Sequence, residues 1–110
     1  MILLAALALA AAAPADVQLA NSERQVDRQF SFAMQRLRSC RANTTQCYYW
    51  QRTIPRLQRE QAAWKSWRDA KAALMAVEME GTSGEREVTS RFKAKLNKDR
   101  ASELSKIGRR

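Results

Sequence analysis

The sequence predicts an all-α fold, a small antiparallel three-helix hairpin or bundle with one disulfide. Glycine and proline are sparse after residue 15, where only Pro55 and the glycines at 81, 84 and 108 occur. Apolar residues recur at intervals of three and four along most of this part, and no alternating strand pattern competes with them. We therefore expect few, long helices joined by short connections.

The first fifteen residues, Met1–Ala15, are almost wholly apolar and end in the small-x-small triplet Ala13-Pro14-Ala15. Such a run is too short to span a bilayer, which takes roughly 18 to 25 residues, but it fits the core of a secretory signal. We therefore expect residues 1–15 to be a signal peptide, with no integral membrane span and a periplasmic or secreted mature chain from near Asp16. No Lys or Arg precedes Ile2, so either the true start lies upstream or the signal is a poor one. A buried Ala/Leu-rich N-terminal helix is the alternative to a signal peptide.

The remaining residues, 16–110, are expected to form a single helical domain. They carry all 20 Lys and Arg and all 11 Asp and Glu, so the domain keeps the net charge of +9. A surface this basic favours anionic partners. An exported chain meets anionic glycolipids, wall polymers and other proteins, and the export signal argues against a nucleic-acid partner.

The first helix is predicted to begin at Ser22 and to run to about Cys40. Ser22 and Gln25 have the spacing of a capping box. The apolar positions that follow recur at helical spacing, and they are Val26, Phe30, Ala33, Met34 and Leu37.

Cys40 and Cys47 are predicted to form a structural disulfide, as is usual for a close pair in an oxidising compartment. The turn-prone residues Asn43-Thr44-Thr45 lie between them. A redox pair or a metal site is the alternative, but the spacing is not C-x-x-C, and two thiols without histidine make a poor zinc site.

The second helix is predicted to start near Thr53, with Pro55 in its first turn, and to end at Gly81-Thr82-Ser83-Gly84. Its expected buried residues are Leu57, Trp64, Trp67, Leu74 and Val77. Thr82 and Glu85 form a second capping box, which predicts the start of a third helix. The expected apolar stripe of that helix is Val88, Phe92, Leu96, Leu104 and Ile107.

The sequence gives little support for an enzymatic function. The chain has no histidine, which removes Ser-His and Cys-His nucleophiles and imidazole metal ligands. The carboxylate pairs Glu78/Glu80 and Glu85/Glu87 have i,i+2 spacing, which points the two side chains different ways on a helix. The segment Gly81–Gly84 lacks the strand and the lysine of a phosphate loop. We expect a protein that is not an enzyme and that uses no cofactor and no metal.

The most specific pattern lies in the second helix. Gln61, Trp64 and Arg68 are spaced i, i+3 and i+7, so they share one face and can form a polar layer between helices. Asp69 can pair with a basic residue of a neighbouring helix. The alternative is that the tryptophans are ordinary core residues and that Arg68 and Asp69 solvate the flank.

Three segments carry a family resemblance. Residues 57–70, LQREQAAWKSWRDA, match the pattern L-x-x-x-Q-x-x-W-x-x-[YW]-R-D-A, residues 27–31, DRQFS, approximate D-x-x-L-N, and residues 96–104, LNKDRASEL, approximate L-T-x-x-R-x-x-x-L. Over residues 27–104 the chain thus resembles the LprI-like lysozyme-inhibitor domain, a small exported helical family also catalogued as a domain of unknown function. The resemblance implies scaffold roles for Leu57, Gln61, Trp64, Trp67, Arg68, Asp69 and Arg100. The family's usual cysteine after R-D-A is absent, because Lys71 follows Ala70.

The resemblance also implies inhibition of a lysozyme-like muramidase by occlusion of its substrate cleft. The expected partner contacts are the aromatic and arginine residues near the cysteines, namely Arg41, Tyr48, Tyr49, Trp50 and Arg52. Core packing of Tyr48 or Trp50 is the alternative. A net charge of +9 makes an acidic or neutral muramidase an easier target than a basic one.

A rival function is a basic envelope protein that binds anionic glycolipid or cell-wall polymer. Its expected contacts are the cationic residues Arg36, Arg38, Arg41, Arg52, Arg56, Lys93, Lys95 and Lys98. Such binding weakens steeply with salt, because it depends on charge attraction.

Overall fold

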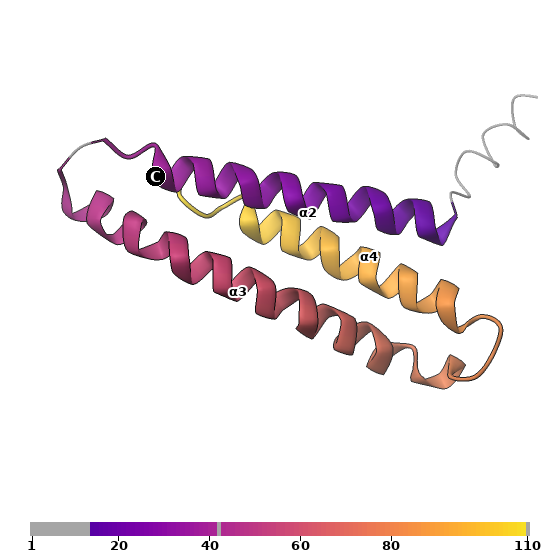
Figure 1. Cartoon of the computed structure of the whole chain (residues 1–110). Coiled ribbons are helices and arrows are strands. Elements are labelled where there is room, and N and C mark those ends of the chain that lie inside the picture. Colours follow the sequence, from indigo (N-terminus) through magenta and orange to yellow (C-terminus); the bar gives the residue numbers. More distant parts are fainter. Residues whose placement is uncertain (1–13, 42, 110) are drawn as a thin grey trace, which may run out of the picture.

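The all-α prediction is confirmed. A computed structural model describes residues 14–41 and 43–109, so residues 1–13 of the expected signal peptide lie outside the described part. Within these ranges three long helices follow one another, α2 (Ala15–Arg38), α3 (Thr45–Met75) and α4 (Glu85–Leu104), with a 3-10 turn η1 (Val77–Met79) before α4. Figure 1 shows that α3 runs opposite to α2 and that α4 returns alongside α2. Across the described residues, no helix combines the length and the apolar character that crossing a membrane takes.

Helix α2 begins at Ala15, earlier than the predicted start at Ser22. The Ser22 hydroxyl does not cap a helix end, because its Oγ donates to the Leu19 carbonyl at 2.8 Å within the helix. Ala15, Leu19 and Ala20, which precede Ser22, are good helix formers, and Ala15 is buried. The helix therefore extends by several residues beyond the expected one.

Helix α3 begins at Thr45, not near Thr53. Thr44 is the N-cap, because its Oγ1 accepts a hydrogen bond from the Cys47 N–H at 3.2 Å. Pro55 lies inside the helix and not in its first turn. The predicted turn is accordingly shorter, and Tyr48, Tyr49 and Trp50 belong to a helix.

Helix α4 begins at Glu85 with Gly84 as its N-cap, so Thr82 and Glu85 do not form the predicted capping box. The Thr82 hydroxyl donates to the Met79 carbonyl at 2.7 Å. The Glu85 carboxylate instead accepts from the Gly81 N–H at 3.1 Å. Gly81 has a φ of 76°, a left-handed conformation that favours glycine at this turn.

The apolar core lies between the helices toward the end where α2 and α4 both finish. Its buried members are Val26, Ala33, Met34, Leu37, Leu57, Ala101 and Leu104, with Phe30, Trp50, Ile54, Trp64 and Ile107 packed against them. Three residues predicted as core are exposed, Trp67 at 51%, Leu74 at 64% and Val77 at 53%. The inner face of α3 carries Gln61, Arg68 and Ala72 instead, which turns the apolar residues between them toward solvent.

Candidate functional site

The structure brings the motif residues into a buried polar layer across the three helices. The Arg100 side chain of α4 is only 1% exposed. Its Nε donates to Gln61 Oε1 at 2.9 Å, its Nη1 pairs with Glu103 Oε1 at 2.7 Å, and its Nη2 pairs with Glu60 Oε1. A buried guanidinium is costly without partners, and here its three nitrogens are all paired.

A second chain of contacts continues the layer to α2. Arg68 Nη1 donates to Asn97 Oδ1 at 3.1 Å, and Asn97 Nδ2 donates to Ser22 Oγ at 3.0 Å. Arg68 also pairs with Asp69 at 2.9 Å and approaches Glu23 Oε1 at 3.7 Å. Asn97 is fully buried, and Ser22 is 3% exposed. Side chains from α2, α3 and α4 thus meet through one continuous set of hydrogen bonds.

The other motif positions lie around this layer in different ways. The Trp64 ring has the guanidinium carbons of Arg68 and Arg100 at 5.5 and 5.4 Å from its centroid, and Leu57 is buried. Asp69 is exposed on one side and also lies 3.6 Å from Lys93 of α4. Trp67 is exposed and lies outside the layer.

The connection between α2 and α3 is held by a disulfide. Cys40 and Cys47 are bonded, with their Cα atoms 5.5 Å apart, so the predicted pair is confirmed. The Ser39 N–H donates to the Gln35 carbonyl at 2.9 Å and closes the end of α2. The Thr44 cap opens α3 on the other side of the loop. The turn between the two helices is therefore fixed at both ends.

The charge of the chain is concentrated in this helical hairpin. Residues 28–59 contain no Asp, Glu or Lys but seven arginines, namely Arg28, Arg36, Arg38, Arg41, Arg52, Arg56 and Arg59. Six of the seven are exposed, and only Arg36 is half-buried. We call residues 28–59 the acid-free hairpin. The end of the hairpin at which α2 and α3 are connected extends past the end of α4 (Figure 1).

Arg36 joins this hairpin to the end of α4. Its Nε donates to the Ile107 carbonyl at 2.8 Å and its Nη2 to the Leu104 carbonyl at 3.0 Å. A cation at the C-terminal end of a helix is favoured by the helix dipole and satisfies carbonyls that have no partner within the helix. Burial, with the nearby Arg109 as a second cause, lowers the pKa of Arg36 from its ordinary value. An arginine nevertheless stays charged at neutral pH.

An aromatic and cationic row lies on the solvent side of α3. Tyr48, Arg52, Arg56 and Arg59 are spaced i, i+4, i+8 and i+11, so they share one face. The guanidinium carbon of Arg52 lies 5.3 Å from the centroid of the Tyr48 ring. Tyr49 meets the Tyr48 ring edge-on, with the centroids 5.5 Å apart and the planes at 70°. Tyr48 is 54% exposed and Tyr49 is 62% exposed.

The five predicted contact residues fall into two groups by exposure. Arg41, Tyr48, Tyr49 and Arg52 are exposed, whereas Trp50 is half-buried and packs against the core. A depression of about 280 Å³ beside the disulfide is lined by Arg41, Asn43, Tyr48 and Gln51. We call the exposed residues Arg41, Tyr48, Tyr49, Arg52, Arg56 and Arg59 the tip surface. Arg59 was not among the sequence-based candidates, although its spacing from Tyr48 reveals it once α3 is known to start at Thr45.

The described residues contain no group of three Asp, Glu or Cys side chains placed so as to hold a metal ion. The geometry that stands out is instead a projecting, disulfide-fixed surface of arginine and tyrosine. Arginine and tyrosine are enriched among the residues that dominate protein–protein interfaces, so this surface has the composition of a binding site.

Comparison with known proteins places the chain in one family. The family model described as lysozyme inhibitor LprI matches residues 6–104, which include all of the segment on which the resemblance rests. The match confirms that resemblance. No curated protein and no solved structure gives a significant match to the chain.

Proposed function

The chain belongs to the LprI family of lysozyme inhibitors, and we propose that it is an exported, non-enzymatic inhibitor whose tip surface enters the substrate cleft of a muramidase. Glycoside hydrolases work with two carboxyl groups that flank the scissile bond. A cationic projection that fits into such a cleft pairs with these carboxylates and keeps the glycan out. The family membership supports the inhibitory role, and the hairpin supports this way of achieving it.

The observation that carries the proposal is the absence of any acidic residue from residues 28–59, where seven arginines occur. Within this hairpin no carboxylate competes for the guanidinium groups at the tip. Arginine also presents a planar fork that binds a carboxylate through two parallel hydrogen bonds, which lysine does not. A surface whose cations are all arginines is therefore suited to the recognition of carboxylates.

The tyrosines supply surface area that a bound partner would bury, and they do so at a low cost in conformational entropy. Tyr48 and Tyr49 are largely exposed before any partner binds, and each contacts a neighbouring side chain that limits its motion. A preordered side chain loses less conformational freedom on binding. Tyr48 with Arg52 is accordingly the proposed anchor of the interface.

Charge restricts the choice of target. The chain carries a net charge of +9, and the tip concentrates positive charge at the surface that would meet the enzyme. Like charges slow association and do so most at low salt. We propose that the target is an acidic or neutral muramidase and not a strongly basic one.

The deciding assay measures turnover of a peptidoglycan substrate by a panel of muramidases at fixed salt, with and without the full chain. We expect inhibition of at least one enzyme of low isoelectric point. The double variant Arg52→Gln/Arg56→Gln should raise the inhibition constant by about tenfold or more, because it removes two guanidinium groups from the tip.

The matched control is Lys71→Gln/Arg86→Gln, which removes the same charge from exposed positions outside the hairpin. Neither control residue makes an ion pair in the described part of the chain. The control should change inhibition by less than about threefold, the effect of net charge alone. Unchanged turnover across the whole panel, or equal losses in both double variants, would contradict the proposal.

A further inference from the structure

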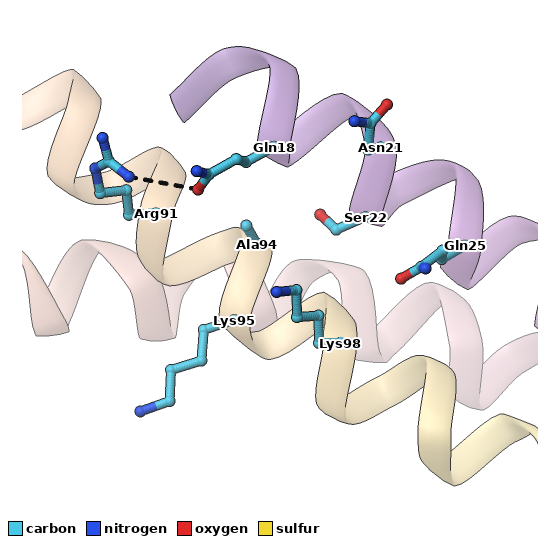
Figure 2. Close-up of a pocket in the computed structure, with 8 residues that line it drawn as sticks. All are labelled: Gln18, Asn21, Ser22, Gln25, Arg91, Ala94, Lys95 and Lys98. Atoms are coloured by element: carbon cyan, nitrogen blue, oxygen red, sulfur yellow. Dashed lines mark hydrogen bonds between the residues drawn. The ribbon is translucent and has the colours of Figure 1, made fainter. Parts of the chain in front are cut away.

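A groove separate from the tip surface lies between the first half of α2 and the middle of α4. Its volume is about 330 Å³. One wall is made by Gln18, Asn21 and Gln25 of α2, and the other by Arg91, Lys95 and Lys98 of α4. Figure 2 shows Gln18 and Arg91 meeting across the groove and Lys98 reaching past Ala94 into it, whereas Asn21 and Lys95 point away from the opposite helix. The walls thus differ in chemistry, with amides on one side and cations on the other.

The spacing of both rows shows how the sequence builds the groove. Residues 18, 21 and 25 are spaced i, i+3 and i+7, and residues 91, 95 and 98 are spaced i, i+4 and i+7, so each row lies along one face of its helix. Further along the same helix pair, the contact is apolar and contains Ala33, Leu37 and Leu104. The polar lining follows the outer edge of this helix pair, where Gln25, Gln29, Lys98 and Ser102 line a second depression of about 310 Å³.

The floor and one end of the groove are fixed by internal contacts. Ser22 is 3% exposed and is held between the Leu19 carbonyl and Asn97 Nδ2. Arg91 Nη1 donates to Gln18 Oε1 at 3.4 Å and joins the two helices at one end, while Arg91 Nη2 pairs with Glu87 at 2.9 Å. A preformed concave site needs little rearrangement to accept a ligand.

Of the three cations that line the groove, Arg91 is paired with Glu87, so the charge left unneutralised is that of the two lysines. No carboxylate lines the groove. Lys95 and Lys98 make no ion pair in the described part of the chain, whereas Lys65 and Lys93 each pair with an aspartate. Figure 2 shows the Lys98 side chain beside Ala94 and the α2 wall, and the Lys95 side chain directed away from α2. Lys98 is therefore the cation best placed to meet a ligand in the groove.

We propose that this groove binds one anionic sugar unit, a ring of hexose size that carries a carboxylate or a phosphate. The Lys98 ammonium group binds the anion, and the amides of the α2 wall donate to and accept from ring hydroxyls. The volume lies at the small end of the range for ligand pockets, which suits one sugar ring. The Arg91–Gln18 hydrogen bond links the two walls at one end of the groove, so a longer acidic peptide would have to extend past the other end. This inference does not depend on inhibition of a muramidase.

The test follows amide chemical shifts of the isotope-labelled full chain during titration with glucuronic acid, glucose 6-phosphate, glucose, inorganic phosphate and tetraglutamate. We expect saturable shifts confined to residues 18–25 and 91–98 with one or both of the anionic sugars, and weak or no shifts there with glucose. The stronger of the two anionic sugars identifies a carboxylate or a phosphate as the recognised group. Tighter binding of tetraglutamate, or equal binding of inorganic phosphate, would overturn the proposal.

Two variants and one control tie the shifts to the groove. Lys98→Gln should weaken binding of the preferred sugar by about fivefold, the loss of one exposed charge contact. Gln25→Ala tests the opposite wall and should also weaken binding, by a smaller factor. Lys106→Gln removes the same charge at an exposed position outside the groove and should change affinity by less than about twofold. Equal effects of Lys98→Gln and Lys106→Gln on sugar affinity would refute a defined site. Inhibition of the muramidase should be unchanged in Lys98→Gln, because Lys98 lies outside the tip surface.

Discussion

Arg68 of α3 and Arg100 of α4 hold their guanidinium carbons 5.5 and 5.4 Å from the centroid of the same ring, that of Trp64. Both guanidinium groups are also hydrogen-bonded to the opposite helix, Arg68 to Asn97 and Arg100 to Gln61. These contacts are directional, so they are lost when one helix slides or rotates relative to its partner. We infer that the polar layer fixes how α3 meets α4, where an apolar contact alone would tolerate other registers.

The first prediction is that Arg100→Ala lowers the free energy of unfolding by about 3 kcal/mol, because it leaves Gln61 Oε1 buried without its partner and frees Glu60 and Glu103. Arg100→Lys should restore only part of the loss, since one ammonium cannot reach all three oxygens. Chemical denaturation followed by circular dichroism measures both. The exposed control Arg86→Ala should stay within about 0.5 kcal/mol of the parent. A similarly small effect of Arg100→Ala would show that the layer does not stabilise the fold.

The disulfide gives the second prediction. Cys40 and Cys47 close a short loop, and the chain-entropy estimate for such a loop is about 2.5 kcal/mol. The double variant C40S/C47S should therefore unfold at lower denaturant concentration by that free energy. Adding a reductant should destabilise the parent to the same level and leave the double variant unchanged. Equal stability of the oxidised parent and the double variant would contradict the estimate.

The third prediction concerns Arg36, whose side chain holds the end of α4 through two carbonyl oxygens. Arg36→Ala should cost about 1 kcal/mol of global stability, because it removes a helix-end cation, leaves the Ile107 carbonyl to water and leaves the Leu104 carbonyl with the Ile107 N–H. The local effect should be larger. Amide hydrogen exchange of residues 104–108 should accelerate, while that of residues 45–75 in α3 should change only by the global amount. Uniform acceleration along the whole chain would argue against a local capping role.

The order of the helices, the disulfide and the polar spacing of Gln61, Trp64 and Arg68 could all be predicted from the sequence, because each depends on local spacing. The helix starts could not. Ser22 has the pattern of a cap, but its hydroxyl is used inside α2 and accepts from Asn97, a residue of a helix far along the chain. Trp67 was predicted to be buried because it is large and apolar, yet the inner face of α3 is occupied by Arg68 and its partners.

The wrongly predicted start of the second helix also affected the candidate binding surface. With the helix start placed near Thr53, Tyr48 belonged to a loop, and its relation to Arg56 and Arg59 could not be read from spacing. The start at Thr45 puts them on one face of one helix. The groove between α2 and α4 depends on two helices lying side by side, which no local pattern specifies.

The last prediction separates two neighbouring aromatic residues by opposite outcomes. Tyr48 is 54% exposed and contacts Arg52 at the surface, whereas Trp50 is half-buried against the core. Tyr48→Ala should leave the free energy of unfolding within about 0.5 kcal/mol of the parent but raise the inhibition constant against the target muramidase by about tenfold, because it removes a proposed interface anchor.

Trp50→Ala should lower the free energy of unfolding by about 2 to 3 kcal/mol through loss of core packing. Its inhibition constant, corrected for the folded fraction, should change by less than about threefold. Each variant serves as the control for the other, and if Trp50→Ala weakens inhibition more than Tyr48→Ala while remaining fully folded, the tip surface as defined here is not the interface.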